Sequence, residues 1–169
     1  MPRLIGAMMI LISGFTFGLI QIRSFRQEEL ALEELIRAID TIAAELACRL
    51  TVLPELCLMA AKNGQTQVSE VFKTLSTRLY DHNSPSARQC LEDVILEKSG
   101  VPELAKRNLV ILANSFGQFD MELQLSSLDT VKQMCRRDLA GLQSTRETKL
   151  KSTQVLGFCA GAALVILLI

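Results

Sequence analysis

Hydrophobic residues form an unbroken run at each end of the chain, and between the runs they recur with helical spacing. Residues 4–22 read LIGAMMILISGFTFGLIQI, in which one glutamine is the only strongly polar residue. As a helix they span about 28 Å, close to the ~30 Å hydrocarbon core of a bilayer. Residues 155–169 read VLGFCAGAALVILLI and span about 22 Å, but Lys149 and Lys151 can reach the headgroups from a longer helix. The pattern predicts transmembrane helices over residues 1–22 and 155–169.

Each run has an alternative interpretation. A cleaved secretory signal has an apolar region of about 7–15 residues and then a small-residue cleavage site. The first run is longer and is followed by Arg23, Ser24, Phe25 and Arg26, so a retained helix is favoured. A buried core helix would carry a polar stripe, which the second run lacks.

Cationic residues flank both runs on the side of the central segment. They are Arg23, Arg26, Arg146, Lys149 and Lys151. On the other side of the runs, the positive charges are those of Arg3 and the amino terminus. Because loops rich in lysine and arginine stay in the cytoplasm, residues 23–154 are expected on that side of the membrane.

Each run also holds two glycines one helical turn apart, Gly14 with Gly18 and Gly157 with Gly161. G-x-x-x-G spacing lets two helix backbones approach closely in a membrane. These glycines are candidates for packing against the other span, a second copy of the chain, or another membrane protein.

The central segment reads as a series of amphipathic helices without strand-like alternation. From residue 27 to residue 50, one face is apolar: Leu32, Leu35, Ile36, Ile39, Ile42, Ala43 and Leu46. The opposite face carries Glu28, Glu29, Glu33, Glu34, Arg37 and Asp40.

Prolines, caps and glycines mark the remaining helices. We expect starts at Pro54, after Thr66–Gln67, at Pro85 after the N-cap Ser84, and at Pro102, with stops at Asn63–Gly64, Gly100 and Gly117. A last helix is expected from the N-cap Asp120, with the seam Met121, Leu125, Leu128, Val131, Cys135, Leu139 and Leu142, running on into the second apolar run. The fold class is therefore all-α: an antiparallel six-helix cytoplasmic bundle over residues 23–154, flanked by two transmembrane helices.

Composition argues against catalysis and against nucleic-acid binding. The formal net charge is +0, so no long-range electrostatic field attracts nucleic acid. Aromatic residues make up 5% of the chain, which argues against surfaces on which bases stack. His82 is the only histidine, no phosphate-binding glycine loop is present, and the five cysteines lie at least nine residues apart. We therefore expect no enzyme activity, cofactor, metal or small-molecule substrate. We expect the cysteines to be free thiols.

Two charged clusters are candidate docking sites. Glu28, Glu29, Glu33 and Glu34 could form a solvated helix face, a protein-docking surface or a general acid/base site. Arg136 and Arg137 could dock an acidic partner or lipid, or be solvated.

Several segments resemble the stage III sporulation protein AB family. They are the start LIGAMMILISGFTFGLI, the segment TIAAELACRLTVLPELCLMAA, the segment NLVILANSFGQFDMELQ and the ending LGFCAGAALVILLI. The family pattern places a glutamate before a Thr-x-Leu-Pro-Glu turn, and the matching positions here are Glu45, Thr51, Leu53, Pro54 and Glu55. The family often has proline where this chain has Val52, and residues 61–101 match loosely.

The resemblance implies a role in endospore formation. Family members sit in the mother-cell membrane around the forespore, in a complex encoded with a secretion-type ATPase, and their cytoplasmic domain is similar to the F domain of type II secretion and type IV pilus platform proteins. It implies a scaffold subunit that docks the ATPase and other membrane subunits. The alternatives are a platform subunit of a general secretion or pilus system and, from another class, a small membrane enzyme.

Overall fold

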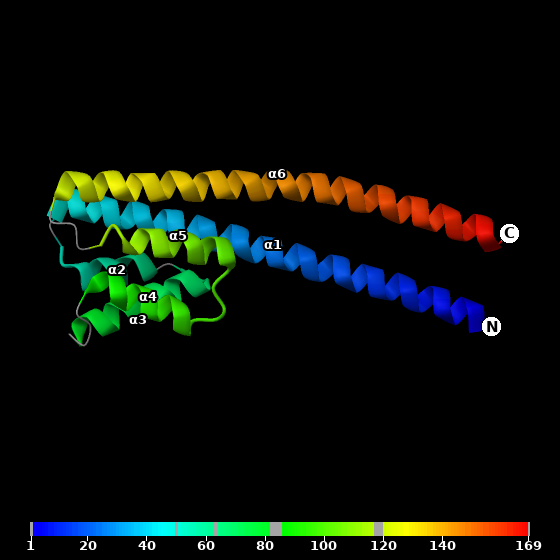
Figure 1. The fold of residues 1–169 in the computed structure, drawn as a ribbon, viewed down its shortest axis with the longest axis horizontal. Helices are drawn as coiled ribbons and strands as arrows, with labels where there is room; N and C mark the ends of the chain where they lie inside the picture. Colours follow the sequence, from blue (N-terminus) through cyan, green and yellow to red (C-terminus); the bar gives the residue numbers. More distant parts are fainter. Residues whose placement is uncertain (1, 50, 63, 82–85, 117–119, 169) are drawn as a thin grey trace.

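The computed structural model places helices along almost the entire chain (Figure 1). The structure describes residues 2–49, 51–62, 64–81, 86–116 and 120–168. Within these ranges it describes the side chains of residues 24–48 and those from residue 51 to residue 145. In this part of the chain there are six α-helices and no strand: α1 (Pro2–Arg49), α2 (Leu53–Ala61), α3 (Gln67–Tyr80), α4 (Ala87–Glu97), α5 (Glu103–Ala113) and α6 (Met121–Leu168). The predicted all-α class is confirmed.

Two long antiparallel helices form the axis of the molecule. α1 and α6 have 48 residues each and lie side by side for half their length, then separate toward the chain ends (Figure 1). The four short helices pack against them at the opposite end, where α1 contacts α2, α3 and α5. Both termini therefore lie at one end of the molecule, and the bundle lies at the other.

The first helix differs from the prediction in its continuity. A membrane helix ending at residue 22 and a separate bundle helix were expected, but α1 runs unbroken from Pro2 to Arg49. The reason is that residues 23–26, Arg-Ser-Phe-Arg, include neither proline nor glycine. The continuity expected for the last helix is confirmed by α6.

The predicted transmembrane helices stay a prediction. Within the part of the chain searched, which is limited to described side chains, no helix combines the length and apolarity needed to cross a bilayer. The side chains of both apolar runs lie outside the described residues, as do the surroundings of Gly14, Gly18, Gly157 and Gly161.

The helix starts follow the capping residues. Asp120 Oδ1 accepts a hydrogen bond from the Glu122 amide at 3.0 Å, as predicted for this N-cap. The Thr66 hydroxyl accepts one from the Val68 amide at 3.1 Å and caps α3, which begins at Gln67. For α4 the cap is Ser86, because the helix begins at Ala87. The predicted cap, Ser84, lies with Pro85 outside the described residues.

The core is built from all six helices. The predicted face of α1 is confirmed, since Leu32, Leu35, Ile39 and Ile42 are wholly buried. On α6 the seam is confirmed from Leu125 to Leu142, whose members are buried or packed against the core: Leu125, Leu128, Val131, Cys135, Leu139 and Leu142. Met121 is an exception at 37% exposed, because it is the first residue of α6, at the end of the bundle.

Candidate interaction surfaces

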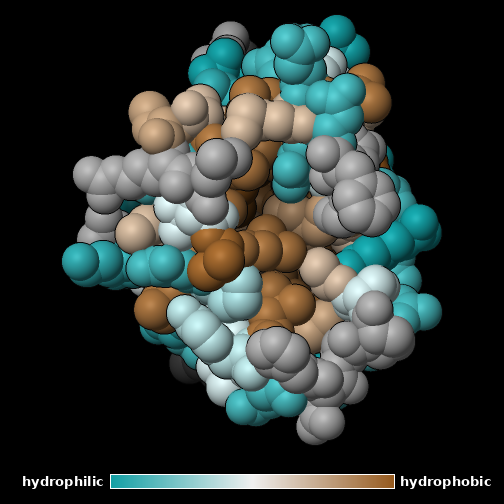
Figure 2. Space-filling model, turned by 90° about the vertical axis from the view of Figure 1, so that its left-hand side faces the viewer, coloured by the Kyte–Doolittle hydropathy of each residue, from teal (hydrophilic) through white to brown (hydrophobic). Residues whose placement is uncertain are grey.

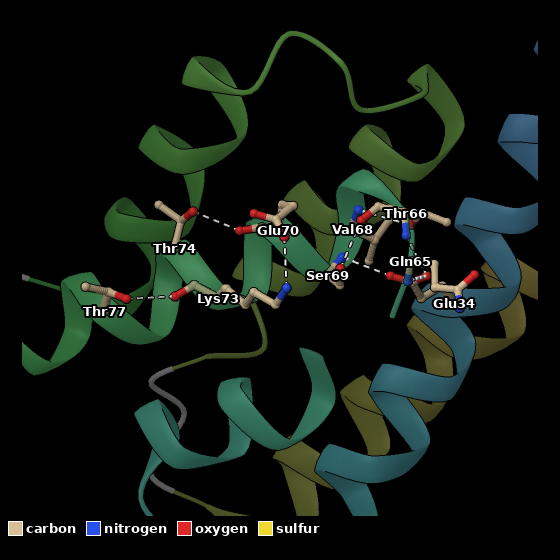
Figure 3. A network of polar contacts seen from close by, with 9 residues as sticks. All are labelled: Glu34, Gln65, Thr66, Val68, Ser69, Glu70, Lys73, Thr74 and Thr77. Atoms are coloured by element: carbon tan, nitrogen blue, oxygen red, sulfur yellow. Dashed lines mark hydrogen bonds and ion pairs between the residues drawn. The ribbon is translucent and has the colours of Figure 1, made fainter. Parts of the chain in front are cut away.

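Glu34 is a buried carboxylate that joins α1 to the start of α3 (Figure 3). Its side chain is 5% exposed. Oε2 accepts hydrogen bonds from the backbone amides of Gln65 at 2.9 Å and Thr66 at 3.0 Å. Oε1 accepts one from the Ser69 amide at 2.9 Å. The carboxylate thus satisfies amide groups at the positive end of α3, where a helix favours negative charge.

Gly64 is required by this arrangement. A Cβ at residue 64 would lie 2.3 Å from Ser69 Cβ and 2.4 Å from Glu34 Oε1. The loop between α2 and α3 can therefore approach α1 only where it carries no side chain. This close approach brings the amides of residues 65–69 onto the carboxylate.

The expectation that Glu34 lies on an exposed acidic face is thus wrong. The sequence does contain a sign of its burial, because Glu34 lies three residues after Ala31 and four before Ala38. These positions share one helix face, and both alanines are buried.

The other members of the acidic cluster are half-buried. Burial, with the Glu103 carboxylate nearby, raises the pKa of Glu28. Glu29 Oε1 accepts a hydrogen bond from Gln143 Nε2 at 3.1 Å, and Glu33 is partly covered. Of the six docking candidates, two are exposed: Arg136 and Arg137. Partner binding by these six residues stays a prediction.

A second polar cluster fixes α6 against α5. The Arg107 guanidinium donates to both carboxylate oxygens of Asp138 at 2.8 Å. The wholly buried Asn108 amide donates to Asp138 Oδ2 at 2.8 Å and to the Leu104 carbonyl at 2.9 Å. An ion pair between Lys132 and Asp40 joins α6 to α1. Sequence reasoning missed all three contacts, which join residues at least 30 positions apart.

The family-motif residues build the turn between α1 and α2. The Val52 carbonyl accepts from the amides of Glu55 at 3.0 Å and Leu56 at 3.2 Å, and Pro54 occupies the first turn of α2. The Ser76 hydroxyl donates to the Pro54 carbonyl at 2.7 Å, which ties the turn to α3. Thr51 and Leu53 are half-buried in the same turn.

Glu45 is the remaining motif position. It is half-buried on α1, and its buried Oε2 has no hydrogen-bond partner among the described residues. The other four motif positions lie in the turn before α2 and in its first residues.

The end of the bundle far from the termini exposes apolar surface. Figure 2 shows this end, where hydrophobic side chains gather in a central hollow. Val52, which precedes α2, is 61% exposed, and Leu123 in the first turn of α6 is 60% exposed. Tyr80 and Met121, at this end of α3 and α6, are exposed too. Sequence reasoning missed this apolar surface; we call Val52, Met121 and Leu123, which lie where α1 passes to α2 and where α6 begins, the distal patch.

The described residues hold no catalytic constellation. Among them, no group of histidine, cysteine or acidic residues could hold a metal ion, and His82 lies outside them. The four described cysteines are free thiols, of which Cys48 is exposed. Burial, with Cys90 nearby, raises the pKa of Cys57 to about 12. Burial, with Asp138 nearby, raises the pKa of Cys135 to about 12. Neither thiol is primed as a nucleophile.

Comparison with known proteins gives two similarities. The family model for stage III sporulation protein AB matches residues 3–169. A solved structure of stage III sporulation protein AB is similar in fold, with a TM-score of 0.66 and 17% sequence identity, over 72% of this chain and 98% of that chain. No curated protein matches the sequence. At this identity the structural likeness shows a shared fold, whereas the family model covers nearly the whole chain. The chain belongs to the stage III sporulation protein AB family.

Proposed function

We propose that this chain is a non-enzymatic scaffold subunit of the complex that joins mother cell and forespore. In this proposal both apolar end segments cross the mother-cell membrane, and the helical bundle lies in the mother-cell cytoplasm. The bundle docks the secretion-type ATPase of the complex, and the end segments pack with partner membrane helices. Membership of a sporulation protein family supports the setting.

The arrangement of the two long helices carries the proposal. Both termini lie at the end opposite the bundle (Figure 1). Residues 4–22 and 155–168 belong to these helices. One bilayer could therefore hold both apolar segments while the whole bundle stays on one side. The five cationic residues that flank the segments favour the cytoplasmic side.

The distal patch suits a large soluble partner better than the acidic residues of α1 do. From Ile22 to Arg49, α1 rises about 40 Å, so the distal patch stands well clear of the membrane. Glu28 lies only about 9 Å of helix beyond Ile22, near the headgroups. Exposed apolar side chains within a polar rim are typical of protein-docking surfaces. We therefore assign ATPase docking to the distal patch.

Substitution at the distal patch tests this assignment. The variant Val52→Glu with Leu123→Glu replaces the two most exposed members of the patch. We expect at least a tenfold loss of spore formation and of ATPase co-purification, because charge in the contact would have to be desolvated. The matched control is Val110→Glu with Met134→Glu, two exposed apolar residues on α5 and α6. Normal sporulation and ATPase capture by the patch variant would refute the docking assignment.

A further inference from the structure

An apolar groove lies on the outer surface between α2 and α3. It has a volume of about 360 Å³ and is lined by Glu55, Leu58, Met59, Ala61, Lys62 and Lys73. Leu58 is 52% exposed within it. Both lysines are exposed; Lys73 pairs with Glu70 at 2.9 Å, whereas Lys62 has no ion pair among the described residues. We call these six residues the α2–α3 groove, a hydrophobic recess whose rim carries Glu55, Lys62 and Lys73.

The outer side of α4 has the opposite character. Leu96 is 73% exposed, more than any other described large hydrophobic residue. Glu92, Asp93 and Glu97 share this side of the helix. Glu92 and Glu97 are paired within the chain, to Arg88 and Arg78 respectively. Asp93 is exposed and has no described ion pair. We call Glu92, Asp93, Leu96 and Glu97 the α4 ridge, one protruding leucine among acidic groups.

The groove and the ridge can complement each other. Leu96 protrudes far enough to fill an apolar recess, and the exposed Asp93 carboxylate can pair with the exposed Lys62 ammonium. α2 and α4 both run from the end of the bundle far from the termini toward the chain ends (Figure 1). A contact between them requires the groove and the ridge to stand at one height above the proposed membrane.

We infer that the α4 ridge of one copy of this chain docks in the α2–α3 groove of a second copy. The inference rests on the membrane anchoring proposed above. Anchoring gives all copies the same orientation, so a contact between two different patches must join them at equal height. Since the two patches differ, the contact is heterologous, and each copy can bind one neighbour on each side. Repeating the contact gives a closed ring if the rotation between neighbours completes a full turn.

Membrane confinement is part of this assembly. A groove of this size with one leucine anchor covers less surface than a stable interface in solution, which buries about 1,200–2,000 Å². Two-dimensional confinement with fixed orientation raises the effective concentration of the copies, as linkage does for tethered modules. We therefore expect assembly in membranes and little assembly in dilute detergent micelles.

Paired cysteines in full-length protein in membrane vesicles test the contact. Cys48 and Cys159 are first replaced by Ser and Ala, which leaves the buried thiols of Cys57, Cys90 and Cys135. Leu58→Cys and Leu96→Cys are then combined in one chain and treated with a bis-maleimide. We expect a ladder of dimers, trimers and larger species, at least fivefold above the control pair Leu58→Cys with Val110→Cys. Mixing the two single variants should give dimers and no ladder.

Charge reversal adds a second readout. Lys62→Glu should reduce the ladder at least fivefold, and adding Asp93→Lys should restore at least half of it. Dimers from Leu96→Cys alone would show a two-fold contact and overturn the inference, as would a ladder no stronger than the control. Loss of the protein from the membrane fraction would overturn the anchoring and this inference together. A membrane-bound protein without a ladder would overturn this inference alone.

Discussion

The buried carboxylate of Glu34 yields the sharpest stability prediction. Glu34→Gln keeps the shape of the side chain but replaces one acceptor oxygen with an NH₂ group. Since Oε1 and Oε2 both accept backbone amides, at least one N–H then faces a donor. An unsatisfied buried amide costs about 1–3 kcal/mol. The remaining bonds lose their charge, which costs roughly half their strength.

These contributions together predict a loss of about 2–4 kcal/mol in the free energy of unfolding. Domains of this kind are stable by about 5–15 kcal/mol, so the variant should fold and lose a measurable share of its stability. Glu33→Gln is the matched control, because Glu33 is the neighbouring half-buried glutamate and has no described hydrogen bond. We expect it to change stability by less than about 0.5 kcal/mol.

Hydrogen exchange of the full-length protein in detergent measures the effect locally. The amides of Gln65, Thr66 and Ser69 should exchange about 30-fold faster or more in Glu34→Gln, since 1.4 kcal/mol corresponds to a factor of ten. The amides of α4, which do not contact Glu34, should change their exchange rates less. If Glu34→Gln and Glu33→Gln exchange alike at these amides, the carboxylate does not hold the start of α3 and the reasoning fails.

Three further predictions concern glycine, cysteine and pH. Gly64→Ala should destabilise the protein by about 1–3 kcal/mol because its Cβ would overlap neighbours at 2.3–2.4 Å, whereas Gly141→Ala, with no atom within 4 Å, should stabilise it by about 0.5–1 kcal/mol; thermal midpoints that move in the same direction would contradict this. Among the described cysteines, Cys48 alone should react with maleimide before unfolding, and peptide mapping that finds a second rapidly labelled one would refute the burial. The raised pKa of Glu28 means that the folded state holds its proton more tightly, so its contribution to stability falls as pH rises above about 4.5. Glu28→Gln should therefore raise the unfolding midpoint at pH 7 and leave it unchanged at pH 4, and equal shifts at both pH values would exclude the mechanism.

The parts of the fold that depend on local sequence could be predicted. Helical periodicity identified the buried face of α1, and the candidate cap Asp120 located the start of α6. The start of α3 was expected after Thr66 and Gln67, one residue later than α3 begins. These features are local because a capping side chain bonds amides two or three residues away. The continuity of α6 followed from the same logic, since no proline interrupts it.

The parts that depend on distant partners could not be predicted. Glu34 is buried because amides 31 to 35 positions later reach it across the α2–α3 loop. Asn108 and Asp138 meet because α5 and α6 pack in one particular register. The distal patch arises where helix ends meet in space, and nothing in a periodic pattern marks which end residues stay uncovered. Each of these features requires tertiary structure.

Site-specific photo-crosslinking in sporulating cells tests the scaffold role most directly. A photoreactive amino acid replaces Leu123 in the distal patch or, as the control, Val110 on α5, in full-length protein expressed at its normal level. The account predicts a crosslinked adduct with the secretion-type ATPase, identified by mass spectrometry, from position 123 and not from position 110. ATPase adducts from position 110 alone, or none from position 123 in cells that form spores normally, would contradict it.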